Sequence, residues 1–161
     1  MTKQIEGSCS CGKVCYEVIG LPLIVHCCHC SYCQRQTGTA FALNALFEAD
    51  KVKLTQGKVE EINTPSPSGK GQTIARCPDC KTAVWSNYHM GGIKKGIRFI
   101  RVGTLNNPEQ LPPDVHIFTA SKQKWVNLSQ EKLVFDHFYH FNEVWSEENN
   151  AIRQQLLANS K

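Results

Sequence analysis

The chain has 161 residues, of which 41% are hydrophobic and 20% are charged, and its formal net charge is +4. This length and composition are ordinary for one folded domain, and the short, interrupted apolar runs exclude a membrane-spanning helix. The lysines and arginines are scattered rather than gathered in a basic stripe, which argues against nucleic acid as a partner.

The first ten residues, MTKQIEGSCS, lack the basic and apolar regions of a signal peptide. We therefore expect a cytoplasmic protein. The sequence also has no internal repeat and no linker long enough to divide it, so we expect a single domain over residues 1–161.

Short segments bounded by turn residues predict a mainly β fold. In chain order the predicted strands cover residues 12–19, 42–47, 52–54, 72–76, 82–85, 97–102 and 115–119. The clearest loop is residues 64–71, TPSPSGKG, with two prolines and two glycines. The three tryptophans, Trp85, Trp125 and Trp145, are expected in the core or in the wall of a pocket.

Two segments have helical patterns. Residues 31–36 can form one or two turns, with Ser31 as the expected N-cap and Gly38 as the stop. The tail, about residues 146–159, begins with Ser146 before two acidic residues and continues with apolar residues at helical spacing. We expect this C-terminal helix to pack on the core or to form a homodimer contact.

Seven of the nine cysteines lie in three tight clusters. The clusters are Cys9 and Cys11 (CxC), Cys28, Cys30 and Cys33 (CxCxxC), and Cys77 and Cys80 (CPDC). In a reducing compartment such spacings indicate metal ligands rather than disulfides. A closed structural zinc site takes four protein ligands and a catalytic one takes three, so seven cysteines fit one zinc ion of each kind.

The spacing also predicts how the clusters combine. CxC and CPDC can each grip one metal ion from a single turn, so we expect Cys9, Cys11, Cys77 and Cys80 to form a structural site that closes a loop of more than sixty residues. The CxCxxC cysteines, Cys28, Cys30 and Cys33, can converge on a second, catalytic zinc ion, with its fourth position left for water or substrate.

Neighbouring residues leave two questions open. Cys15 and Cys27 are expected to be small buried side chains, but Cys27 with His26 and His29 could also supply a fourth ligand to the second site and make both zinc ions structural. Arg35, just after Cys33, is the basic residue expected nearest the second metal ion, and is a candidate for binding an anionic substrate. His116 is expected to be a hydrogen-bonded residue on a strand.

Four segments carry a family resemblance: CSCGKVCYEV, HCSYCQRQTGTAF, RCPDCKTAVW and PPDVHIFTASKQKWV. In this order they resemble the family of glutathione-dependent formaldehyde-activating enzymes, over about residues 5–128, which leaves the rest as a C-terminal extension. The chain departs from the usual family pattern at Arg76, where phenylalanine is common, and at Lys81, where glycine is common.

The resemblance implies an Mss4-like arrangement of twisted β-sheets around two zinc ions. Cys9, Cys11, Cys77 and Cys80 then match the structural ligands, and Cys28, Cys30 and Cys33 match the catalytic ones. It further implies a carbon–sulfur lyase or synthase that adds glutathione or another thiol to formaldehyde or another small aldehyde. The alternative is a zinc-stabilised module that binds protein or nucleic acid without catalysis.

Overall fold

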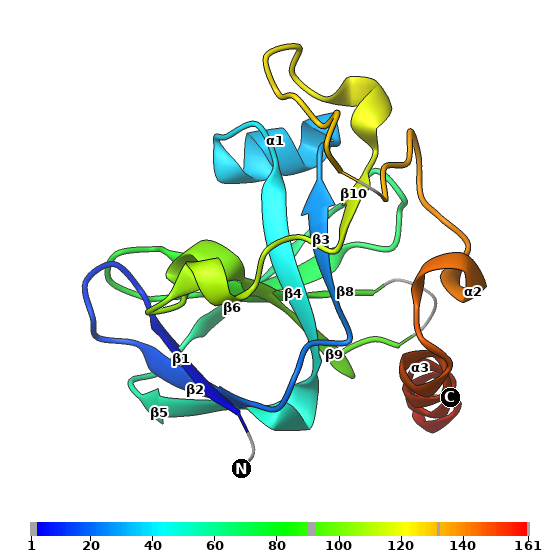
Figure 1. The fold of residues 1–161 in the computed structure, drawn as a ribbon. Helices are drawn as coiled ribbons and strands as arrows, with labels where there is room; N and C mark the ends of the chain where they lie inside the picture. The colour runs from blue at the N-terminus through cyan, green and yellow to red at the C-terminus, as the bar shows by residue number, and fades with distance from the viewer. Residues whose placement is uncertain (1–2, 90–92, 132, 161) are drawn as a thin grey trace.

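The computed structural model describes residues 3–89, 93–131 and 133–160, which form two β-sheets with short helices at the ends. The smaller sheet is antiparallel, with strands in the order β1 (Gln4–Ser8), β2 (Cys15–Ile19) and β5 (Val52–Gln56). It lies at the lower left of Figure 1, away from the helices at the C-terminus. Alternate residues of β1 and β2 are buried, as expected of a sheet with one face on the core.

The larger sheet has seven strands in the order β10-β3-β4-β9-β8-β7-β6. Their bounds are β3 (Ile24–Cys28), β4 (Ala42–Glu48), β6 (Glu60–Thr64), β7 (Gln72–Arg76), β8 (Ala83–Tyr88), β9 (Ile97–Arg101) and β10 (Val115–Ile117). β10 pairs in parallel with β3, and the other neighbours are antiparallel. All five residues of β3 are buried, because β3 has a strand on each side and packed side chains on both faces.

Among the described residues, three α-helices lie outside the sheets. They are α1 (Ser31–Thr37), α2 (Phe141–Val144) and α3 (Glu147–Asn159). Short 3-10 turns cover Ala49–Lys51, Val102–Thr104, Pro108–Gln110 and Thr119–Ser121. α1 follows β3 at the top of Figure 1, and α2 and α3 lie at the right.

Two groups of buried side chains form the core. The first lies between the sheets and includes Tyr16 and Trp85, whose rings meet edge to face at 5.7 Å between centroids. The second lies beneath the C-terminal segment and includes Leu46, Tyr139 and Trp145. The apolar side chains of α3 pack against this second group, which accounts for their helical spacing.

The mainly β prediction, with a short helix after the CxCxxC cysteines and a C-terminal helix, is confirmed. The arrangement is consistent with the Mss4-like architecture that the resemblance implies. Ser146 is the N-cap of α3, as expected, because its side chain accepts a hydrogen bond from Asn149 N. Across residues 3–89, 93–131 and 133–160, the structure contains no helix with the length and hydropathy that crossing a bilayer requires.

Other predictions were wrong in detail. The N-cap of α1 is Cys30 rather than Ser31, since the Cys30 sulfur accepts a hydrogen bond from Cys33 N. Trp125 is 73% exposed instead of lying in the core or in a pocket wall. Cys15 is only half-buried. The sequence patterns also missed β1, β3 and β6 as strands.

Candidate metal centres and cavity

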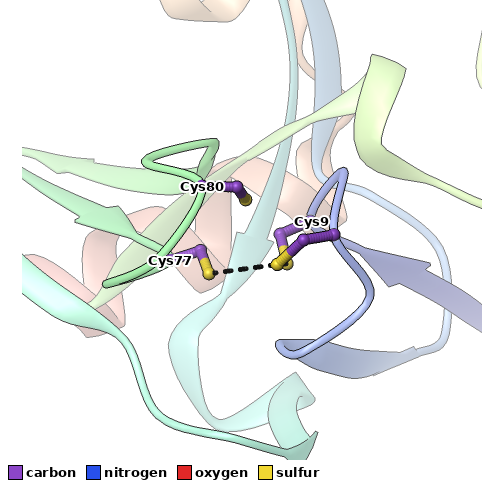
Figure 2. Close-up of side chains that lie close together, drawn as sticks. Cys9, Cys77 and Cys80 are labelled. Atoms are coloured by element: carbon purple, nitrogen blue, oxygen red, sulfur yellow. Dashed lines mark hydrogen bonds between the residues drawn. The ribbon is translucent and has the colours of Figure 1, made fainter.

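The first cysteine group joins the two sheets. Cys9 and Cys11 lie in the turn between β1 and β2, and Cys77 and Cys80 lie in the turn between β7 and β8. Figure 2 shows Cys9 facing the turn that carries Cys77 and Cys80. The four sulfurs all lie within 4.8 Å of one another, with Cys9 and Cys11 at 3.5 Å and Cys11 and Cys77 at 3.8 Å. Sulfur ligands of one tetrahedral zinc ion are separated by about 3.8 Å, so this group can hold a zinc ion.

Backbone groups hold both turns in shape. Val14 N donates to the Cys9 sulfur at 3.3 Å, and Lys81 N donates to Cys77 O at 3.0 Å. Lys81 has a left-handed backbone with φ of 62°, a conformation that glycine adopts with least strain. Its Nζ reaches Glu60 at 2.9 Å on the neighbouring strand.

Hydroxyl groups favour the thiolate form in this group. Hydrogen bonds from the side chains of Ser10 and Thr82 lower the pKa of Cys80 to about 4. These two hydroxyls also contact each other at 2.8 Å and so tie the two turns together. Metal ligation requires thiolates, and hydroxyl and N–H donors around the sulfurs are the usual outer partners of such ligands.

The second cysteine group lies where β3 meets α1. Cys28 is the last residue of β3, Cys30 caps α1, and Cys33 lies in its first turn. The three sulfurs lie within 4.8 Å of one another, and Cys33 N donates to the Cys30 sulfur at 3.3 Å. The strand-to-helix turn therefore gathers three soft ligands over only six residues.

The three thiols cannot all ionise without a cation beside them. Hydrogen bonds from Cys28 and Cys33 lower the pKa of Cys30 to about 3. Hydrogen bonds with Cys30 and Cys33 raise the pKa of Cys28 far above its ordinary value. One thiolate is thus stabilised at the expense of the others, and a bound divalent ion such as zinc is what would allow all three to be thiolates.

This second group opens into a cavity of about 630 Å³. Much of the wall is aromatic, with Tyr32, Tyr88, Phe99, Phe118 and Phe138. The loop at residues 64–71 forms part of the rim, where Tyr32 Oη donates to Pro65 O at 2.7 Å and Tyr88 contacts the Ser68 hydroxyl at 2.7 Å. A mostly apolar cavity of this size with a few polar groups is typical of small-molecule sites.

Arg101 is a cationic residue in the wall of this cavity. It is partly buried at the end of β9, and its Nη1 donates to Asn44 Oδ1 at 2.8 Å. Arg101 lines the same cavity as the second cysteine group, and while burial lowers the pKa of Arg101, the charge of Cys33 acts in the opposite direction. A guanidinium remains protonated in proteins, so Arg101 offers a fixed positive charge.

Arg35 lies elsewhere, although it is only two residues from Cys33. Its side chain is exposed on α1, and the residues that line the cavity do not include it. A role for Arg35 in substrate binding stays a prediction. The sequence patterns did not indicate Arg101 as a site residue, because it is far from every cysteine cluster in the sequence and reaches the cavity through strand pairing.

His26 also lines the cavity and is held by the C-terminal segment. Trp145 Nε1 donates to the Tyr139 oxygen at 2.6 Å, and the Tyr139 hydroxyl is in turn hydrogen-bonded to His26 Nε2. Burial lowers the pKa of His26 to about 3, so the imidazole is neutral at physiological pH. Residues after the cysteine clusters therefore help to build the site.

Cys27 and His29 do not gather with the second cysteine group. Their side chains group instead with His116 of β10, on the other face of β3. The structure does not bring Cys27, His26 and His29 into the second cysteine group, so it does not contain the alternative in which they close that site. His116 is hydrogen-bonded to His29 through Nδ1, as expected of a buried histidine.

Comparisons with known proteins bear on the family of the chain rather than on individual site residues. A comparison with curated proteins found no match. Among solved structures, one similar chain is a Rhodobacter sphaeroides protein solved as a structural-genomics target, with 15% identity, coverage of 81% of this chain and 98% of that one, and a TM-score of 0.47. The family model described as "Glutathione-dependent formaldehyde-activating enzyme" matches residues 4–121, which include all three cysteine clusters. The chain belongs to the family of glutathione-dependent formaldehyde-activating enzymes.

Proposed function

We propose that this protein joins a thiol to a small aldehyde in the cavity beside Cys28, Cys30 and Cys33, with glutathione and formaldehyde as the first candidates. The thiol sulfur bonds to the carbonyl carbon, the C=O π electrons move to oxygen, and that oxygen takes the proton released by the thiol. The product is an S-hydroxyalkyl adduct, and the reverse reaction breaks the carbon–sulfur bond.

The observation that carries this proposal is the convergence of three thiols on one side of a small-molecule cavity. Three protein ligands are the number used by catalytic zinc sites, and Cys28, Cys30 and Cys33 would hold that zinc ion. When bound there, zinc would supply a positive charge that stabilises a substrate thiolate or polarises a carbonyl. Cys9, Cys11, Cys77 and Cys80 would hold a second, structural zinc ion.

The charged residues of the cavity suit a thiol that carries carboxylate groups. Arg101 lies inside the cavity, and Lys70 lies on the loop at its rim. Guanidinium groups bind carboxylates through paired hydrogen bonds, so Arg101 would anchor one end of the thiol and bring its sulfur near the cysteine group. Lys70 would attract a second carboxylate, and glutathione has two.

The aromatic walls have a separate role. Phe99, Phe118 and Phe138 would keep water away from the reacting atoms, which strengthens the interaction between Arg101 and an anion. Neutral His26 adds no competing charge to this wall.

The cellular setting and the assembly belong to the same proposal. All nine cysteines are free thiols, which suits a reducing, cytoplasmic environment. A homodimer stays a prediction. The apolar residues of α3 pack against the core of the same chain, so they do not by themselves indicate a dimer contact.

The test combines binding and turnover. Zinc-loaded protein is titrated calorimetrically with glutathione, cysteine and an uncharged thiol, and ¹³C-formaldehyde exchange into the S-hydroxymethyl adduct is followed by NMR. We expect glutathione to bind more tightly than the uncharged thiol and exchange to exceed the rate without protein. Cys30→Ser is the control, because serine is a good N-cap that keeps α1 while removing one zinc ligand.

Two results would contradict the proposal. One is that no thiol in the panel binds. The other is that Cys30→Ser accelerates exchange as well as the wild type does. Either result would favour the non-catalytic, zinc-stabilised binding module.

A further inference from the structure

The third cluster of candidate ligands comes from β3 and β10, the parallel pair of strands at one edge of the larger sheet. Successive residues of a strand point to opposite faces, so Cys28 faces the cavity while Cys27 faces away from it. His116 of β10 is in register with Cys27, and paired residues of neighbouring strands share a face. His29, just past the end of β3, completes the group on that face.

The three side chains meet at ligand-to-ligand distances. The Cys27 sulfur lies 3.5 Å from His29 Nε2, and His29 Nε2 lies 2.9 Å from His116 Nδ1. A tetrahedral zinc ion separates sulfur and nitrogen ligands by about 3.6 Å and two nitrogen ligands by about 3.3 Å. The sulfur already lies at the required separation, and the two imidazoles need to part by only a few tenths of an ångström.

The four ring nitrogens of the group divide into two that face one another and two that point away. His29 Nε2 and His116 Nδ1 face one another, and the Cys27 sulfur contacts His29 Nε2. His29 Nδ1 and His116 Nε2 are buried and have no partner at hydrogen-bond distance among the residues that the structure describes. These two outer nitrogens would carry the ring protons when the facing nitrogens bind a metal ion, so each imidazole can offer a lone pair to the same point.

The Glu131 carboxylate lies near the outer nitrogen of His116, where metal-bound histidines usually have a carboxylate partner. It lies 3.6 Å from His116 Nε2, on the side of the ring opposite to His29. A carboxylate there favours a proton on Nε2 and leaves the Nδ1 lone pair free to face a metal ion. This carboxylate–imidazole arrangement is independent of the ligand distances and leads to the same conclusion.

We propose that Cys27, His29 and His116 form a third metal site, which takes zinc or a similar divalent transition metal. One thiolate and two imidazoles are ligands of this class of ion, and three protein ligands are enough when water completes the tetrahedron. Binding displaces the proton of Cys27. The ion connects β3 to β10 from the face opposite the cavity, so it acts as a brace between two strands.

X-ray absorption at the zinc edge can test this site without any activity assay. The other two groups contain only cysteine ligands, so imidazole scattering from zinc-loaded, tag-free protein would come from the third group. We expect three zinc ions per chain by elemental analysis, together with this imidazole signal. Two zinc ions without imidazole scattering would overturn the proposal and leave the group as a buried hydrogen-bonded contact.

Variants give a second, matched comparison. Cys27→Ala and His116→Gln should each bind one zinc ion fewer than the wild type and lose the imidazole signal. Cys15→Ala is the control, because Cys15 is outside all three groups, and it should bind as much zinc as the wild type. Unchanged zinc content and scattering in folded Cys27→Ala would contradict the site. If the two variants do not fold, the wild-type measurements decide.

Discussion

At the scale of single residues, the cysteine groups could be predicted from the sequence and the cationic residue of the cavity could not. The cysteine spacings predicted which sulfurs would gather, because ligands in a tight turn are close whatever the rest of the chain does. The cationic residue could not be found in this way. Arg35 is near Cys33 in the sequence but lies exposed on α1, whereas Arg101 reaches the cavity through the pairing of β9 with β4. Long-range pairing of this kind leaves no local signal in the sequence.

Arg101→Gln tests the cation of the cavity. We expect the KM for glutathione to rise at least about tenfold, because a charge-assisted hydrogen bond contributes about 1.5–3 kcal/mol and each 1.4 kcal/mol is a factor of ten. Steady-state exchange kinetics with glutathione and with an uncharged thiol measure the effect, which should be small for the uncharged thiol.

Arg35→Gln is the matched control for Arg101. If Arg35→Gln raises the KM for glutathione and Arg101→Gln does not, the sequence prediction is right and the role of Arg101 is wrong. A general loss of stability in Arg101→Gln would affect both thiols equally, so the comparison between thiols separates the two causes.

At the scale of elements, turns were easier to predict than strands. The CxC and CPDC turns and the cap of α3 have residue patterns with local causes, and the structure contains them where expected. β3 was missed because its sequence, IVHCC, was interpreted as a ligand segment, although strand alternation applies to it as well. That alternation was the available signal that His26 and Cys28 share one face and Cys27 and His29 share the other.

Cys80→Ser should destabilise the fold, whereas Cys30→Ser should not. Cys80 belongs to the group that ties the smaller sheet to the larger one, so losing it should lower the free energy of unfolding by several kcal/mol or remove the cooperative transition. Cys30→Ser should keep the fold and lose one zinc ion together with activity. Chemical denaturation, gel filtration and zinc content measure these outcomes.

Cys15→Ser is the control for this pair, since it changes a half-buried cysteine of β2 outside the three groups. Its transition should match that of the wild type to within about 0.5 kcal/mol. A Cys80→Ser variant as stable as Cys15→Ser would contradict the structural role of the first group.

At the scale of the whole molecule, the site extends beyond the part that the family model matches. The match ends at residue 121, but Phe138 lines the cavity and Tyr139 holds His26. The C-terminal helix is attached as well, because Asn149 Nδ2 donates to Leu23 O at 2.8 Å just before β3. A single domain with a C-terminal extension stays a prediction, and these contacts indicate that the extension and the core act together.

Trp145→Phe tests this connection. The ring keeps its place in the second core group, but the N–H that donates to Tyr139 is lost, so we expect the free energy of unfolding to fall by about 1–3 kcal/mol. Trp125→Phe is the control, since Trp125 is exposed, and it should change stability by no more than about 0.5 kcal/mol. Equal effects of the two substitutions in urea denaturation would show that the C-terminal segment is not attached in this way.

The alternation of ligands along β3 has a consequence for how the protein matures. A shift of one residue in the pairing of β3 would turn Cys27 toward the cavity and Cys28 away from it, and the segment would still present a sulfur to each face. The chemistry of the side chains therefore does not distinguish the correct register from the shifted one; the neighbours β4 and β10 do. Metal that bound this segment before the strands paired would find a sulfur on each face in either register, so it would not select the correct one. Correct assembly therefore requires that β4 and β10 set the register of β3.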